Sequence, residues 1–180
     1  MITVVSDTHA TDGHRLTGRT LDAVREAELV VHAGDFTTES VLDAFEAETG
    51  SETDEEGEFV AVFGNNDDAG VRGRLGAERV VDRAGVRFVV VHGHEHDETS
   101  LSLLGRQERA DVVVVGHSHE PGVRQGGATT VLNPGSHADP RWYRPAHAEL
   151  EPAGEGLAGR LVAPNGEAFS EFDVPATGRE

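Results

Sequence analysis

Seven side chains that can bind metal ions follow short apolar runs of the sequence. They are Asp7, His9, Asp35, Asn65, His92, His117 and His119. Their oxygen and imidazole donors suit Mn²⁺, Fe²⁺, Zn²⁺ or Ni²⁺ rather than Ca²⁺, which prefers oxygen ligands alone. Such a set is too large for one four-coordinate zinc. The inventory therefore favours two metal ions that share a carboxylate, and Asp35, alone in its loop, is the expected bridge.

The spacing within two motifs supports this hypothesis. Asp7 and His9 stand at positions i and i+2 of "DTH", and His117 and His119 do so in "GHSH". In extended backbone, residues i and i+2 point the same way, so we expect both members of each pair to reach one target. Taken singly the motifs are weak, because turns commonly contain Gly, Asn and Asp. Together and in this order, they predict a metal site.

The elements that must position these residues are short Val-rich runs. They span residues 2–5, 28–33, 58–63, 86–91, 110–115 and 129–132. Nearly continuous apolar runs of this length are typical of strands buried on both faces. Helix-like stretches lie between several of them, at 18–28, 38–48 and 98–110, the last interrupted by Gly105. The alternation predicts an α/β fold with a largely parallel or mixed sheet, whose carboxyl-end loops meet along one edge.

The remaining segments carry weaker signals. After Pro134, short strands separated by Gly and Pro predict antiparallel hairpins. The acidic segment 46–58 is interpreted as a solvated surface loop. The chain has 180 residues and neither an internal repeat nor an interdomain linker. We therefore expect a single domain over residues 1–180.

The amino-acid composition indicates the environment of the protein and the classes of partner that it can bind. The chain has 33 acidic and 15 basic residues, all of the latter Arg, and a net charge of −18. An acidic partner-binding surface is one interpretation, but the bias runs along the whole chain and so favours adaptation to high salt. Nucleic-acid binding is disfavoured because no basic patch with interleaved aromatics is found. With no membrane-spanning run, no signal peptide and no cysteine, we expect a soluble, cytoplasmic protein; a homo-oligomer is left open.

In combination, the motifs resemble those of the calcineurin-like metallophosphoesterases. The matching residues are "DTH" (7–9), "GD" (34–35), "GNND" (64–67), His92 and "GHSH" (116–119). The short prokaryotic phosphodiesterase branch of that family is similar also in "HGH" (92–94) and in "NPGS" (133–136) followed by Pro140 and Arg141. The resemblance covers roughly residues 1–150. It implies an α/β fold of four layers, an αββα sandwich of two mixed sheets flanked by helices.

The resemblance also implies ligand sets and a reaction. One metal would take Asp7, His9, Asp35 and His119, and the second would take Asp35, Asn65, His92 and His117. The implied enzyme is a phosphodiesterase in which a hydroxide bridging two divalent ions, with Mn²⁺ the expected metal, attacks a small-molecule phosphate ester in line. A nuclease fits the chemistry but lacks a basic track for the polymer. The alternative is a non-catalytic interaction scaffold of the same fold, like the small retromer subunit, although none of the expected ligands is missing here.

The acid that protonates the leaving group is less well defined. The larger phosphatases of the family carry a histidine after the Asn ligand, where this chain has Asn66, which cannot donate a proton at ordinary pH. Asp67 is the catalytic candidate, with His94 or a metal-bound water as alternatives. Orienting a neighbouring ligand is the more conservative role for Asp67. His32 is expected to pack near the site, and loop or surface positions are expected for His14, His96, His137 and His147.

Overall fold

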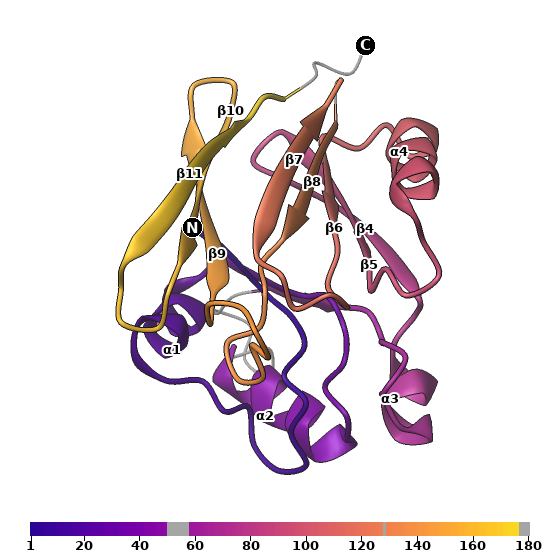
Figure 1. Cartoon of the computed structure of the whole chain (residues 1–180), viewed down its shortest axis with the longest axis vertical. Helices are drawn as coiled ribbons and strands as arrows, with labels where there is room; N and C mark the ends of the chain where they lie inside the picture. Colours follow the sequence, from indigo (N-terminus) through magenta and orange to yellow (C-terminus); the bar gives the residue numbers. More distant parts are fainter. Residues whose placement is uncertain (50–57, 128, 177–180) are drawn as a thin grey trace.

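The Val-rich runs form the central strands of two mixed β-sheets (Figure 1). The computed structural model describes residues 1–49, 58–127 and 129–176. The first sheet, in the order β11-β10-β9-β1-β2-β3, comprises β1 (Ile2–Val5), β2 (Leu29–His32), β3 (Glu58–Ala61), β9 (His147–Ala153), β10 (Gly156–Val162) and β11 (Ala168–Val174). The second, in the order β4-β5-β6-β8-β7, comprises β4 (Glu78–Arg83), β5 (Val86–Val91), β6 (Val112–Val114), β7 (Gly122–Gly126) and β8 (Thr129–Asn133).

Apolar side chains on both faces of these strands create four layers. On β1, Val4 packs in the core between the two sheets, whereas Val5 packs in a second core on the outer face. The helices α1 (Gly18–Glu26) and α2 (Glu39–Glu48) close that second core. On the outer face of the second sheet lies α4 (Glu98–Gln107), at the right of Figure 1. The αββα sandwich is therefore confirmed, and burial on both faces explains the continuous apolar runs.

Parallel pairing decides where the polar loops lie. In the first sheet β1, β2 and β3 are parallel neighbours, and in the second β5, β6 and β8 are. Parallel strands end at the same edge of their sheet. The loops after β1, β2, β3, β5 and β6 carry all seven predicted metal ligands.

The sequence pattern did not predict three of the described elements, β4, β7 and α3. The strands β4 and β7 are the two edges of the second sheet, and most of their side chains are exposed or half-buried. The helix α3 (Ala69–Arg74) is short and begins at Asp68, whose side chain accepts a hydrogen bond from the N–H of Val71. Edge strands and short helices bury few apolar residues, so periodicity reveals them poorly. The predicted interruption at Gly105 is wrong, because α4 runs through it and packs it closely against Thr129.

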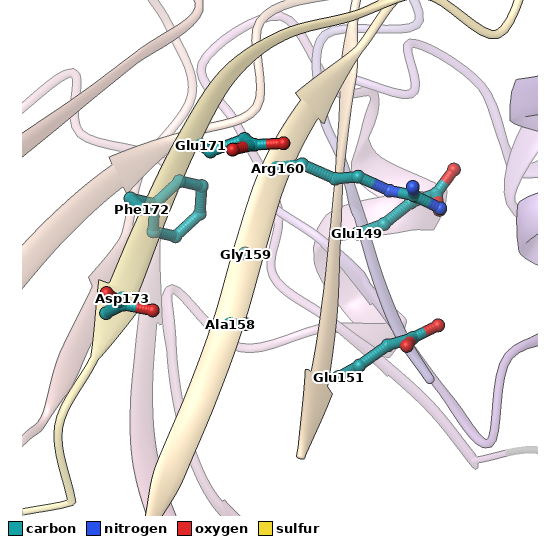
Figure 2. Close-up of a pocket in the computed structure, with 8 residues that line it drawn as sticks. All are labelled: Glu149, Glu151, Ala158, Gly159, Arg160, Glu171, Phe172 and Asp173. Carbon is teal, nitrogen blue, oxygen red and sulfur yellow. The ribbon is translucent and has the colours of Figure 1, made fainter. Parts of the chain in front are cut away.

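The segment after Pro134 forms the predicted antiparallel hairpins, β9 to β11. On their outer face Arg160 reaches across to Glu149, with 2.7 Å between Nη2 and Oε2 (Figure 2). Glu149 is buried and also accepts hydrogen bonds from Arg19 of α1 and from His147. The carboxylate thus fixes α1 to the sheet.

Two further sequence expectations bear on the fold. Residues 46–48 of the predicted acidic loop belong to α2, and residues 50–57 lie outside the described part of the chain. Among the described helices, none combines the length and the apolar character needed to cross a membrane.

Candidate metal centre

The seven predicted ligands gather where the two sheets present their carboxyl edges to each other. The first sheet supplies Asp7 and His9 after β1, Asp35 after β2 and Asn65 after β3. The second sheet supplies the imidazoles of His92, His117 and His119. The oxygen donors thus come from one sheet, and all but one of the imidazoles come from the other.

Asp7 is the carboxylate nearest to His119. Its Oδ1 lies 3.4 Å from Nε2 of His119 and 3.8 Å from Nε2 of His9. These three side chains form one group whose donor atoms all lie within 4.8 Å of one another. The rings of His9 and His119 stack with their centroids 4.8 Å apart. The three donor atoms are thus close enough to one another to hold a metal ion.

Asp35 joins this group to the ligands of the second sheet. Its Oδ2 lies 3.3 Å from Nε2 of His9 and 3.2 Å from Nε2 of His92. Burial opposes ionisation of Asp35, but the contacts with His9 and His92 outweigh it and hold the pKa of this carboxyl well below its usual range. Asp35, with Asp7, raises the pKa of His9 from 6.5 to about 9. The carboxylate therefore lies between His9 and His92, and Asp7, Asp35 and His92 form a second group whose donor atoms all lie within 4.8 Å of one another.

Asn65 completes the arrangement on the other side. Its Oδ1 lies 3.1 Å from Nε2 of His92 and 3.1 Å from Nδ1 of His117. The backbone N–H of His117 donates to both carboxylate oxygens of Asp7, at 3.2 and 3.0 Å. The ligands thus form a continuous cluster, in which Asp7, Asp35 and Asn65 each contact imidazoles.

The extended-backbone premise for the i and i+2 spacing is wrong. Asp7 and His9 have φ angles of 54° and 45°, and His117 and His119 have 66° and 61°. These are left-handed values that non-glycine residues adopt at a cost of order 1 kcal/mol each or more. Asp35 shares the conformation, with φ of 61°. Left-handed residues in the loops, rather than extended strands, thus direct these side chains. Asp7 and His9 reach the same group, as expected, whereas the expectation of one target is wrong for His117 and His119, because His119 faces Asp7 and His117 faces Asn65.

The donor set and its hydrogen bonds fit metal ions. His92 donates Nδ1–H to the carbonyl of Ala33 at 2.7 Å, and His119 makes a short contact of the same kind with the carbonyl of Asp139. This leaves Nε2 of both rings as the basic nitrogen, as is usual for metal-binding histidines. Nε2 of His119 is buried and has no hydrogen-bond partner among the described residues. A cation held between it and Asp7 would satisfy it.

Several residues orient the ligands. Both carboxylate oxygens of Asp67 are used to accept three backbone N–H groups, from Gly64, Asp35 and Thr37, at 2.6 to 3.1 Å. Burial raises the pKa of Asp67 despite these hydrogen bonds. Asn66 donates to Asp35 through both its backbone and its side-chain amide. The loops after β2 and β3 are thereby locked to each other.

The expected packing of His32 near the site is confirmed. The buried ring stacks on Phe36, accepts the N–H of Gly34 at Nδ1 and lies 2.9 Å from the hydroxyl of Thr8 at Nε2. Since Nδ1 accepts, the neutral ring donates Nε2–H to Thr8. Burial holds the pKa of His32 well below its usual range. His32 therefore links the loops of Asp7 and Asp35.

The serine contacts to Asp7 were not anticipated from the sequence. Ser6 donates to Oδ2 of Asp7 at 2.6 Å, and Ser136 donates to its carbonyl at 2.7 Å. The only sequence signal for Ser136 was its place in "NPGS". Arg141 lies 4.0 Å from Asp139, which supports pairing with a local carboxylate.

Two of the remaining histidines are not at the surface. His147 is fully buried on β9, and His137 is buried against Phe45 with Nε2 3.0 Å from the carbonyl of His14. The surface or loop expectation is therefore wrong for His147, whereas His137 lies in a loop, as expected, but is buried. His94 lies beside the cluster, with its ring centroid 5.5 Å from that of His92.

Known proteins share both this sequence pattern and this fold. The family model for the calcineurin-like phosphoesterase superfamily domain matches residues 1–151, and the chain belongs to that superfamily. A probable metallophosphoesterase of Methanothermobacter thermautotrophicus is 32% identical over 170 residues, which cover 90% of this chain and 91% of that one. A phosphodiesterase of Methanocaldococcus jannaschii is 29% identical over 121 residues, or 60% of this chain and 66% of that one. Metal-dependent phosphoester hydrolysis is thus the activity of the class.

Solved structures of other proteins share this fold. Wild-type Vps29 of Entamoeba histolytica, solved in complex with Zn²⁺, has a TM-score of 0.72 and 21% identity, with 96% of this chain and 98% of that one covered. At this identity the likeness concerns the fold alone.

Proposed function

We propose that this chain is a phosphodiesterase that hydrolyses a small-molecule phosphate ester with two divalent ions, Mn²⁺ first among them. The observation that carries the proposal is the convergence of Asp7, Asp35 and Asn65 on imidazoles of both sheets, at 3.1 to 3.4 Å. Two ions bound there would activate water and neutralise charge on the phosphate oxygens. The named phosphodiesterase among the relatives supports the choice of a diester.

The proposed ligand sets are those that the family motifs imply, and the contacts of Asp35 support them. Asp7, His9, Asp35 and His119 hold one ion, and Asp35, Asn65, His92 and His117 hold the other. Asp35 serves both sets because it contacts His9 and His92 with the same oxygen. Its ionised state and the Nδ1 hydrogen bonds of His92 and His119 present the donor atoms in the form that metals need.

For Asp67 we propose a positioning role as the better supported one. Its carboxylate accepts three backbone N–H groups of the ligand loops, which favours orientation over proton transfer. Direct catalysis by Asp67 stays a prediction. His94 is the alternative acid, since its ring lies next to His92 and His117.

The test compares variants of the cluster with a matched surface variant. Asp35→Asn and His117→Ala, assayed with Mn²⁺ on a chromogenic phosphodiester, should each lose activity on the order of 100-fold or more. Asp35→Asn alters a ligand of both sets, and His117→Ala removes one from the second set. Asp173→Asn, exposed on β11, should keep wild-type activity. Circular dichroism shows whether the variants fold. Wild-type turnover in both cluster variants would refute the ligand assignment.

The alternative is an interaction scaffold, which the fold shared with Vps29 also fits. It predicts that the purified wild-type protein binds metal but turns over no phosphoester with any of Mn²⁺, Ni²⁺, Fe²⁺ or Zn²⁺. The intact ligand cluster favours the enzyme. Turnover of a substrate panel across these metals separates the two functions.

We propose that the acidic composition reflects adaptation to a salt-rich environment. The cytoplasmic location of the protein stays a prediction. With a net charge of −18, self-repulsion destabilises the folded chain at low ionic strength and is screened by salt. We expect Tm to rise by several degrees between about 0.1 M and 2 M KCl. A Tm that falls over this range would contradict adaptation to salt.

A further inference from the structure

A pocket of about 450 Å³ lies beside the metal cluster, on the side of the second sheet that faces α4. Apolar side chains line it, namely Leu101 of α4, Val115 after β6 and Val131 of β8. Polar residues line it as well, among them Glu120, Arg124 and His117. Pockets of this size that combine apolar contact with polar groups are typical of small-molecule sites. Because the pocket adjoins the metal cluster, one ligand could contact both.

One wall of the pocket is also a wall of the cluster. Gly93 follows the ligand His92, and the loop containing Gly116 and His117 lines the pocket. A Cβ atom on Gly116 would lie 2.6 Å from Oδ2 of Asp7, so only backbone separates the pocket from that carboxylate at this point. The ring of His117 contacts Asn65 in the cluster and lines the pocket as well.

Most polar groups around the pocket are already paired. The side-chain amide of Asn133 donates to the carbonyl of Gly116 and to the hydroxyl of Ser118, at 2.9 Å each. Arg124 forms an ion pair with Glu98 at the start of α4. By contrast, Nδ1 of His96 is buried and has no hydrogen-bond partner within the described ranges of the chain. The pocket therefore offers apolar contact, the imidazoles of His96 and His117, and the exposed carboxylate of Glu120.

We propose that this pocket binds the organic substituent of the phosphoester whose phosphate occupies the metal cluster, and that it selects an apolar, ring-sized substituent. The inference rests on the proposed function, because it places the phosphate at the cluster. An apolar ring gains contact with the aliphatic lining and excludes water, whereas a methyl group leaves the pocket filled with solvent. The substrate class is accordingly an aryl or similarly flat, uncharged ester of phosphate.

Gly122 allows the pocket to be filled without disturbing the cluster. It lines the pocket at the start of the edge strand β7, and a Cβ atom placed there meets nothing within 4 Å. Gly126, at the other end of β7, has equal space for a Cβ atom and does not line the pocket. Gly122→Phe is the test variant, and Gly126→Phe is its matched control.

The measurement is binding, without turnover. Phenylphosphonate and methylphosphonate are titrated calorimetrically into the Mn²⁺-loaded protein. We expect wild type to prefer phenylphosphonate by about tenfold or more, in line with what an apolar pocket discriminates. Gly122→Phe should reduce the ratio to near one without weakening methylphosphonate. Gly126→Phe should keep the wild-type ratio.

The outcomes separate this inference from the proposed function. Equal affinity of wild type for the two phosphonates, or an unchanged preference in Gly122→Phe, overturns the pocket assignment even if phosphodiester hydrolysis is found. A preference abolished by Gly122→Phe supports the pocket even if no ester is hydrolysed. Should the phenylalanine variant fail to fold, Gly122→Leu is measured in the same way, with Gly126→Leu as its control.

Discussion

The side-chain amide of Asn66 donates a hydrogen bond to Oδ2 of Asp35, with 2.8 Å between Nδ2 and the oxygen. The backbone N–H of Asn66 donates to Oδ1 of the same carboxylate, also at 2.8 Å. Both oxygens of Asp35 are thus oriented by one residue. Asn66 stands where the larger phosphatases have a histidine, and here it serves the carboxylate that joins the two halves of the cluster.

We predict that Asn66→Ala weakens Mn²⁺ binding by roughly tenfold, because residues that orient metal ligands typically contribute 10–100-fold to metal affinity. The loss should be at the lower end, since the backbone N–H still holds Oδ1. Calorimetric titration with Mn²⁺ measures it. Asn165→Ala, at an exposed turn, is the control. Unchanged Mn²⁺ affinity in Asn66→Ala would contradict the orienting role.

Asp67→Asn distinguishes positioning from acid catalysis. An amide presents NH₂ to backbone N–H donors that now face carboxylate oxygens, so we expect the free energy of unfolding to fall by about 3 kcal/mol. Activity should fall to the same extent on esters with good and with poor leaving groups. Denaturant unfolding and a leaving-group series provide the two measurements. A loss confined to poor leaving groups would identify Asp67 as the acid instead.

His137 should make the fold sensitive to acid. Burial lowers its pKa from 6.5 to about 4 in the folded state, whereas the unfolded chain retains the ordinary value. Above pH 6.5 both states are neutral at this residue and it contributes nothing. Between pH 6.5 and 4 the unfolded state binds a proton that the folded state does not, so stability is lost as pH falls, by at most about 3 kcal/mol.

His137→Gln tests this dependence, because its amide can still donate to the carbonyl of His14 but does not titrate. Urea unfolding of both proteins from pH 7.5 to 4 gives the difference in free energy of unfolding. We expect wild type to lose more stability than the variant across this range. Parallel curves for the two proteins would show that His137 is not responsible.

Glu149 should be a major determinant of stability. Burial opposes its ionisation, but His147, Arg19 and Arg160 outweigh this and hold the pKa of Glu149 well below its usual range. Glu149→Ala leaves these partners without their carboxylate, and breaking a buried ion pair of this kind costs about 3–5 kcal/mol. Glu151→Ala, exposed two residues along β9 and labelled in Figure 2, should cost less than about 0.5 kcal/mol. Equal Tm values for the two variants would contradict this role.

Much of the site could be predicted because each ligand lies in a short motif directly after a strand. Each ligand follows an apolar run, and turn residues end each strand at the same edge. The positions of Asp35 and Asn65 after glycine have a structural cause: a Cβ atom on Gly64 would collide with the carboxylate of Asp35. The burial of His147 could not be predicted in this way, because the sequence around it is typical of a hydrophilic strand. His147 is buried because it packs against α1, where the hydroxyl of Thr20 lies at its Nδ1.

The sequence by itself determined the donor types, their order along the chain and the Val-rich strands that carry them. Only the tertiary structure decided which donors meet. His9 from the first sheet and His92 from the second lie at the same oxygen of Asp35, although 83 positions separate them in sequence. Periodicity describes which face of one strand is buried, whereas this contact depends on how the two sheets pack on their common core. Periodicity also does not reveal that Asp7 and His9 have left-handed rather than extended backbone where they face the cluster.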